Sequence, residues 1–128
     1  MMDVKLSTAG WYALFNKNVE NSSDADLFIR KDGKIGLNVQ ALGYSGYVDA
    51  DNWHRIVWTV KNSYLTIYMD GALVIASTAA NTRWNLRSTG SLIFADNSAE
   101  DNDIYVSNVT LWSDYLTASQ VSSLGKIK

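Results

Sequence analysis

One stretch near the middle of the chain alternates hydrophobic and polar positions with the period of β-strands. Residues 53–61 are dense in β-branched and aromatic side chains, and residues 64–69 and 72–76 continue the pattern. Asn62-Ser63 and Asp70-Gly71 separate these runs, and Asp-Gly is a favoured pair for a two-residue hairpin turn of type I′. The stretch therefore predicts three consecutive antiparallel strands.

The same pattern predicts short strands on both sides of this stretch. Asp32-Gly33 is a second type I′ signal between two runs, and residues 43–47 have the glycine spacing of a loop or a bulged strand. The other predicted strands are residues 2–6, 10–15, 26–31, 34–39, 91–95 and 104–112, the last with an irregular register that predicts a bulge. About nine or ten short strands at this spacing indicate an all-β fold in which two antiparallel sheets form a sandwich.

One segment near the end of the chain predicts a short helix. Thr117 is a suitable N-cap, and Gln120 completes a capping box with it. Val121 and Leu124 share an apolar face, and Gly125 ends the helix.

Composition places the chain among folded globular proteins. Of its 128 residues, 47% are hydrophobic and 19% are charged, which suits a single domain over residues 1–128. The 11 basic residues are scattered and the net charge is -2, so we expect no nucleic-acid partner. No apolar run approaches the ~18 residues of a membrane span, so membrane insertion is not expected. The chain has no cysteine, which excludes disulfides and thiolate chemistry.

Three motifs occur in a specific order and spacing. They are Trp53-His54-Arg55-Ile56 at the head of one strand, Tyr68-Met69-Asp70-Gly71 at the next hairpin, and residues 103–121, where a strand precedes the helix. In this order they resemble the laminin-G-like, concanavalin A-like lectin and glucanase domains, which are jelly rolls. Relatives in that family carry a further N-terminal strand. The resemblance therefore implies an open strand edge here, through which the chain could self-associate.

The resemblance also implies binding more than catalysis. It indicates a carbohydrate-binding accessory module of a larger extracellular or cell-surface protein, of a bacterial kind. A protein-interaction or spacer module is the alternative. A glycoside hydrolase is the third reading, because such enzymes need two acids about 5–9.5 Å apart on a concave sheet. Only Glu20 and Glu100 are glutamates, and both lie in predicted loops, so we expect no catalytic residues.

Two acidic segments are candidates for a calcium site. Residues 96–103 hold four carboxylates and two amides within eight residues, and loops far apart in sequence can meet at one end of a sandwich. Ca²⁺ takes six to eight oxygen ligands with tolerant geometry. The candidate ligands are Asp96, Asn97, Glu100, Asp101 and Asp103, with Asp24 and Asp26 from a second cluster that also includes Asn21. The alternative is that these are solvated turn residues. The resemblance adds weight to calcium, because many laminin-G-like domains hold a structural calcium ion.

Aromatic residues in loops are candidates for a carbohydrate platform, since an aromatic face can stack on the apolar face of a sugar ring. The candidates are Tyr44 and Tyr47 in the glycine-punctuated segment, and Trp84 with its neighbours Asn81, Arg83 and Asn85 in the polar loop of residues 77–90. The alternative for Trp84 is a lid over the core. The other tryptophans, Trp11, Trp53, Trp58 and Trp112, lie on predicted strands and are expected to pack.

Overall fold

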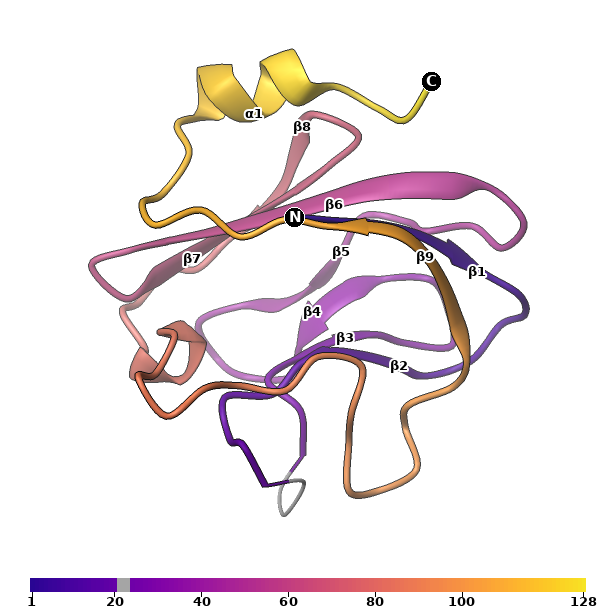
Figure 1. Cartoon of the computed structure of the whole chain (residues 1–128), viewed down its shortest axis with the longest axis horizontal. Helices are drawn as coiled ribbons and strands as arrows, with labels where there is room; N and C mark the ends of the chain where they lie inside the picture. The colour runs from indigo at the N-terminus through magenta and orange to yellow at the C-terminus, as the bar shows by residue number, and fades with distance from the viewer. Residues whose placement is uncertain (21–23) are drawn as a thin grey trace.

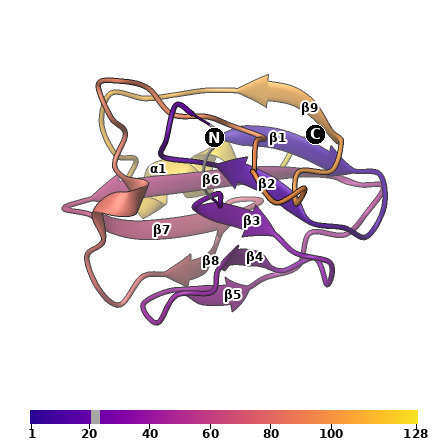
Figure 2. The same ribbon diagram turned by 90° about the horizontal axis from the view of Figure 1, so that it is seen from below.

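The computed structural model describes residues 1–20 and 24–128, and within these residues nine strands form two antiparallel sheets (Figures 1 and 2). The five-stranded sheet has the order β8-β7-β6-β1-β9, with β8 (Ala72–Ala76), β7 (Tyr64–Met69), β6 (Trp53–Lys61), β1 (Met2–Leu6) and β9 (Ile104–Val109). The four-stranded sheet has the order β2-β3-β4-β5, with β2 (Tyr12–Phe15), β3 (Leu27–Ile29), β4 (Ile35–Leu37) and β5 (Gly43–Ser45). The prediction of an all-β sandwich is confirmed.

The main core lies between the two sheets. Alternate residues of β1 face it, so Met2 and Val4 are fully buried, and β7 contributes Leu65 and Ile67 in the same way. Burying one such side chain stabilises the fold by about 1.5–3 kcal/mol, which makes this layer the main source of stability. The sheet packing thus follows directly from the period-two pattern of the sequence.

The two hairpins of the central stretch form as predicted. Asn62 and Ser63 have φ angles of 50° and 64°, and Asp70 and Gly71 have 53° and 85°, so both loops place two residues in the left-handed region. This region costs least for Gly and for Asn or Asp, which explains three of the four residues found there.

The type I′ prediction for Asp32-Gly33 is wrong, although a hairpin forms at this position. Only Gly33 of the pair has a positive φ, of 76°, and the N–H of Arg30 donates to the Lys34 carbonyl across a three-residue loop at 3.0 Å. The Asp32 carboxylate accepts hydrogen bonds from the Arg30 guanidinium at 2.6 and 2.7 Å, which favours the longer loop.

The predicted strand at residues 91–95 is also wrong. Leu92 makes a single bridge to Asn16, and Phe94 has a φ of 57°, which no extended strand tolerates. Strand β9 ends at Val109, so Trp112 lies beyond it and is 36% exposed. The expected irregularity is confirmed, because the register between β1 and β9 shifts between Asp3 and Val4.

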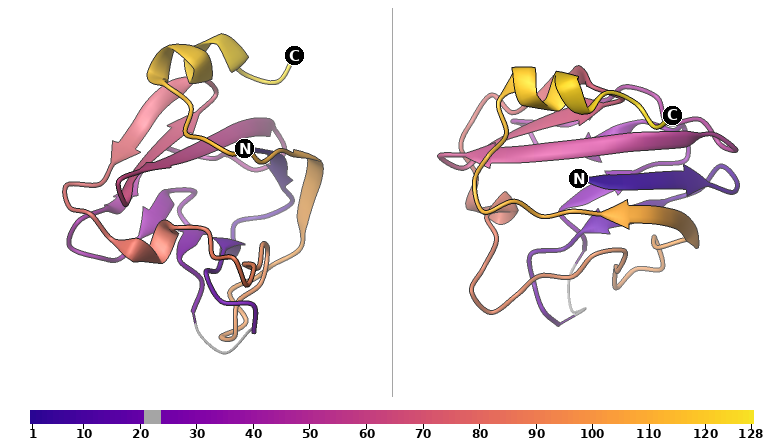
Figure 3. Two further views of the ribbon diagram at one scale, coloured as in Figure 1. Left: turned by 60° about the vertical axis from the view of Figure 1, so that its left-hand side comes forward. Right: turned by 45° about the horizontal axis from the view of Figure 1, so that its top comes forward.

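A 3₁₀ turn (η1, Thr82–Trp84) precedes the acidic loop, and helix α1 (Ala118–Leu124) follows β9. The capping box of Thr117 and Gln120 and the C-cap at Gly125 form as predicted. Helix α1 covers the outer face of the five-stranded sheet, where Val121 packs against Val57 and Tyr68 (Figure 3). No helix among the described residues is long and apolar enough to cross a membrane.

Candidate functional site

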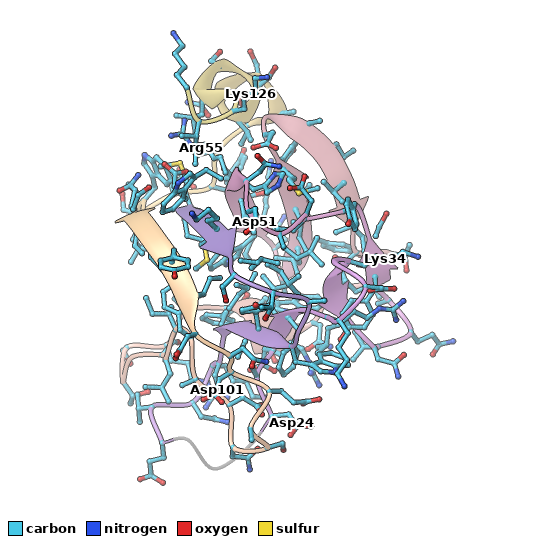
Figure 4. The ribbon with its side chains drawn as sticks, turned by 90° about the vertical axis from the view of Figure 1, so that its right-hand side faces the viewer. Asp24, Lys34, Asp51, Arg55, Asp101 and Lys126 are labelled. Atoms are coloured by element: carbon cyan, nitrogen blue, oxygen red, sulfur yellow. The ribbon has the colours of Figure 1, made fainter. Side chains whose placement is uncertain are left out.

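Three carboxylates meet at the end of the molecule opposite α1. Asp24, Asp96 and Glu100 each place an oxygen within 4.8 Å of the others. Asp24 belongs to the loop that precedes β3, whereas Asp96 and Glu100 belong to the loop that precedes β9. Figure 4 shows Asp24 beside Asp101 of the second loop, far from the helix. We call Asp24, Asp96 and Glu100 the acidic trio.

Hydrogen bonds hold the two loops together. Asp96 is 3% exposed, and its carboxylate accepts the N–H of Ala25 at 2.8 Å and the N–H of Ser98 at 2.7 Å. The Ser98 hydroxyl donates to an Asp24 oxygen at 2.9 Å. Asp96 therefore fixes the loop backbone, whereas Asp24 and Glu100 face the solvent side of the trio.

The negative charges of the trio repel one another. Burial raises the pKa of Glu100 above its usual range, and the negative charges of Asp96 and Asp24 raise it further. Each of these causes disfavours the ionised form of Glu100. A cation placed between the three carboxylates would reverse the charge effects.

The donor set of the trio fits calcium. Oxygens that bind one Ca²⁺ lie ~2.3–2.6 Å from the ion and hence at most about 5 Å from one another. The 4.8 Å spacing of the trio is within that limit. Three carboxylates would supply three to six of the six to eight oxygens that the ion takes, so water or ligand hydroxyls would complete the shell.

The other candidate metal ligands have different positions. The Asp101 carboxylate accepts the N–H of Asp96 at 3.4 Å, and Asn97 contacts the Ser98 hydroxyl at 3.2 Å. Asp103 is exposed just before β9. These three residues belong to the same loop but lie outside the trio, and Asn21 of the second predicted cluster lies outside the described residues.

Asp26 is a structural residue, contrary to its prediction as a metal ligand. It is 3% exposed, and its carboxylate accepts the N–H of Lys17 at 2.8 Å and pairs with the Arg83 guanidinium at 3.3 Å. Burial raises the pKa of Asp26, while the Lys17 hydrogen bond and the Arg83 charge oppose that rise.

The prediction of an exposed platform around Trp84 is wrong. Trp84 is 1% exposed within the main core, and its indole N–H donates to the Asp26 carbonyl at 3.0 Å. Its neighbours have local roles: Asn81 caps η1 by accepting the N–H of Arg83 at 3.1 Å, and Asn85 donates to the Ser63 hydroxyl at 3.0 Å. Trp84 is the lid over the core that was the alternative.

Tyr44 is half-buried in a different aromatic surface. It belongs to an aromatic cluster on the outer face of the four-stranded sheet, with its ring 6.4 Å from Trp11, which packs edge-on against Phe28 at 5.7 Å. The Arg30 guanidinium lies 4.7 Å from the Tyr44 ring centroid. Burial raises the pKa of Tyr44, the Arg30 charge opposes the rise, and the Glu100 carboxylate adds to it.

This outer-face cluster was missed at the sequence level. Its members Phe28 and Tyr44 fall in one cross-strand row with Ala13 and Gly36, as the strand register shows. The alternating pattern of the strands contained this signal. Residues that lie between the core-facing positions of a strand must lie together on the outer face of the sheet. Tyr47 is 62% exposed and lies beside the turn at Gly33.

A laminin-G family model described as the Concanavalin A-like lectin/glucanases superfamily matches residues 4–122. The chain belongs to this family. No curated protein and no solved structure shows a significant match to it.

Laminin-G-like domains are usually non-catalytic and commonly extracellular, and domains of the concanavalin A-like superfamily often bind carbohydrates or proteins. The superfamily also includes glycosidases. The two sheets and the terminal helix of this chain agree with the family fold.

Proposed function

We propose that this laminin-G-like domain is a non-catalytic module that binds carbohydrate at a calcium ion held by the acidic trio, within a larger extracellular or cell-surface protein. The observation that carries the proposal is the convergence of Asp24, Asp96 and Glu100 from two separate loops, within 4.8 Å of one another. Because the three ligands come from two loops that are far apart in sequence, only the folded domain brings them together.

Carbohydrate fits the surroundings of the trio. Sugar hydroxyls are neutral oxygen donors that can complete a calcium shell without adding charge. Trp11, whose carbonyl accepts the Asn102 side-chain amide of the acidic loop at 2.7 Å, and Tyr44 supply aromatic surface. Arg30 has three N–H donors left for further hydroxyls, because Asp32 accepts the other two. This neighbourhood replaces the Trp84 platform as the proposed contact surface.

The carboxylate spacing favours a metal site over catalysis. A retaining glycosidase separates its two carboxyl groups by about 5–5.5 Å and an inverting one by about 6.5–9.5 Å, with an open path for the substrate between them. One oxygen from each carboxylate of the trio lies within 4.8 Å of the other two, and one of the three groups is already hydrogen-bonded to two backbone N–H groups. Holding a cation is the chemistry that suits this arrangement.

The first test is thermal unfolding with added Ca²⁺ and with EDTA. We expect Ca²⁺ to raise the melting temperature, because an ion bound only by the folded state stabilises it by about 2.7 kcal/mol at a concentration of 100 Kd. Asp24→Asn and Glu100→Gln should abolish the calcium shift without lowering the melting temperature in EDTA, because each removes a negative charge that is unfavourable without the ion. Asp96→Ala should also lower stability in EDTA, because it removes the acceptor for Ala25 and Ser98.

Asp103→Asn is the matched control, since Asp103 is exposed in the same loop but outside the trio. It should keep the full calcium shift. An equal curve in Ca²⁺ and EDTA for the parent domain would contradict the metal site. A calcium shift without retention on any immobilised glycan would contradict the carbohydrate proposal and favour a protein ligand or a spacer role.

The calcium shift should depend on pH. The folded-state pKa of Glu100 is raised from 4.5, so the calcium-free domain loses stability as the pH rises from 4.5 through that higher value. Calcium binding needs the ionised carboxylate, so the gap between the Ca²⁺ and EDTA melting curves should widen over the same range. The gap should close as the pH falls toward 4.5, and a gap of constant size in acid would count against Glu100 as a ligand.

A further inference from the structure

His54, the single histidine of the chain, is a buried side chain on the core-facing side of β6. It lies opposite Val4 of β1, which is fully buried, and residues directly opposite in an antiparallel pair share one face of the sheet. Only 9% of His54 is exposed, and its Nε2 atom is buried. Bulk water therefore does not reach this nitrogen, and a hydrogen-bond partner must come from the protein.

A carboxylate faces each nitrogen of the His54 ring. Asp70, in the turn between β7 and β8, places its Oδ2 atom 2.9 Å from Nδ1. Asp49, in the segment between β5 and β6, places its Oδ2 atom 3.3 Å from Nε2, although this contact lacks the alignment of a hydrogen bond. Two acids from separate segments thus enclose one imidazole.

The charged residues of the neighbouring strand positions face the other side of the sheet. Asp3 of β1 binds the Arg55 guanidinium there, and the Lys5 ammonium lies over an aromatic ring. Arg55 also reaches Asp70, because its backbone N–H donates to the Asp70 carboxylate at 2.9 Å and its charge acts on the same group. Asp70 is therefore held in place whether or not the His54 ring is charged.

The two ring contacts cannot both be hydrogen bonds while the ring is neutral. A neutral imidazole has one N–H and one lone pair, whereas an imidazolium has two N–H groups. The shorter and better aligned contact with Asp70 keeps the single proton on Nδ1, so the Nε2 lone pair faces the Asp49 carboxylate. Protonation of the ring replaces this repulsion with a charge-assisted contact.

Asp49 belongs to a short segment that crosses from one sheet to the other. Residues 46–52 leave β5 of the four-stranded sheet and enter β6 of the five-stranded sheet. Ala50 makes a single bridge to Leu6 of β1, and the Asp51 N–H donates to the Leu6 carbonyl at 3.0 Å. The Asp49 side chain adds a contact with β6, so the charge of the ring affects how firmly this segment is held.

We propose that His54 is an acid-operated clamp on residues 49–52. The protonated ring binds Asp70 and Asp49 together and holds the segment against β6, whereas the neutral ring releases Asp49 and loosens the segment. Histidine side chains ordinarily lose this proton near about pH 6.5. The stabilising contribution of Asp49 is therefore present below that range and is lost as the pH rises through it.

The test compares the melting curves of Asp49→Asn and the parent domain in EDTA, at about pH 5.5 and about pH 8. In acid the variant should melt about 3–5 °C below the parent, because a neutral amide forms no ion pair with the imidazolium. At the higher pH the amide can donate to the Nε2 lone pair, so the variant should melt at the same temperature or higher. The acidic trio is unchanged in both proteins, so its own pH dependence cancels in the difference.

Asp51→Asn is the matched control, since it removes the same charge from the same segment. Asp51 is exposed, and its φ of 73° is a conformation that asparagine tolerates. The melting difference between this variant and the parent should be independent of pH. In a His54→Gln background, Asp49→Asn should also have the same effect at both pH values, because glutamine does not titrate. If that background fails to fold, the comparison of Asp49→Asn with Asp51→Asn still decides.

Amide hydrogen exchange shows whether the segment itself loosens. After correction for the intrinsic exchange rate, protection of the Asp51 N–H should fall by about threefold or more from the lower to the higher pH in the parent, but not in Asp49→Asn. The Ser77 N–H, which donates to the Leu65 carbonyl at 2.8 Å, should keep its protection in both proteins.

Either of two results would overturn the proposal. One is a melting difference between Asp49→Asn and the parent that is the same at both pH values, or that Asp51→Asn reproduces. The other is protection of the Asp51 amide that stays constant, or that changes with pH equally in the parent and in Asp49→Asn.

Discussion

Trp84→Ala should lower the free energy of unfolding by about 3–5 kcal/mol, the largest effect we expect from a single substitution in this domain. The indole is 1% exposed between the two sheets and is the largest fully buried side chain of the described residues. Removing it leaves a cavity and also leaves the Asp26 carbonyl without the indole donor at 3.0 Å. Urea unfolding followed by far-ultraviolet circular dichroism measures the loss.

Two further variants separate the causes. Trp84→Phe keeps most of the volume but loses the hydrogen bond, so we expect a smaller loss of about 1–3 kcal/mol. Tyr47→Ala, at a side chain that is 62% exposed, should change stability by no more than about 0.5 kcal/mol. If Trp84→Ala unfolded at nearly the same urea concentration as the parent, the indole would be a surface group and the platform interpretation would regain its basis.

Local chemistry explains which parts of the fold were predictable. Strands β6 and β7 occur at the predicted residues because each run alternates and ends at a turn whose residues tolerate positive φ. Helix α1 begins and ends as predicted because its capping box and C-cap involve residues at most eight positions apart. Such features depend on neighbours in sequence, so a single sequence is sufficient to specify them.

The role of Trp84 could not be predicted in that way. The polar residues around it indicated a surface loop, yet Asp26 accepts the indole N–H from 58 positions away and pairs with Arg83. A buried tryptophan needs a hydrogen-bond partner, and here the partner is a backbone carbonyl. Every residue has such a carbonyl, so no residue type in the sequence identifies the partner. The same contact explains why Asp26 is structural and not part of the acidic trio.

The sequence predicted an acidic site in these loops, but it did not predict which residues form the trio. Sequence composition indicated seven candidate ligands in two loops, and the structure brings three of them together. The selection depends on the bridge from Asp96 to Ala25, a contact between residues 71 positions apart. Pairing of loops at one end of a sandwich follows from strand order, which local patterns do not determine.

Asp3→Ala should have the second largest effect, a loss of about 2–4 kcal/mol in the free energy of unfolding. Asp3 is 4% exposed, and its two oxygens accept hydrogen bonds of 2.8 Å from the Arg55 guanidinium. Arg55 also donates to the Leu124 carbonyl at 2.7 Å, so one guanidinium joins β1, β6 and the last turn of α1. Figure 4 places Arg55 directly beneath the helix. The substitution leaves a largely buried cation without its carboxylate.

The helix gives this prediction a readout beyond global stability. Without Asp3 to orient it, the guanidinium should release Leu124, and the amides of α1 should exchange hydrogen faster than those of β7. Arg55→Lys should produce the same local loosening, because an ammonium cannot bind Asp3 with two parallel hydrogen bonds and reach Leu124 at once. If α1 kept its protection in both variants, the apolar contact of Val121 with Val57 and Tyr68 would be sufficient to hold the helix, and the ion pair would stabilise only the sheet.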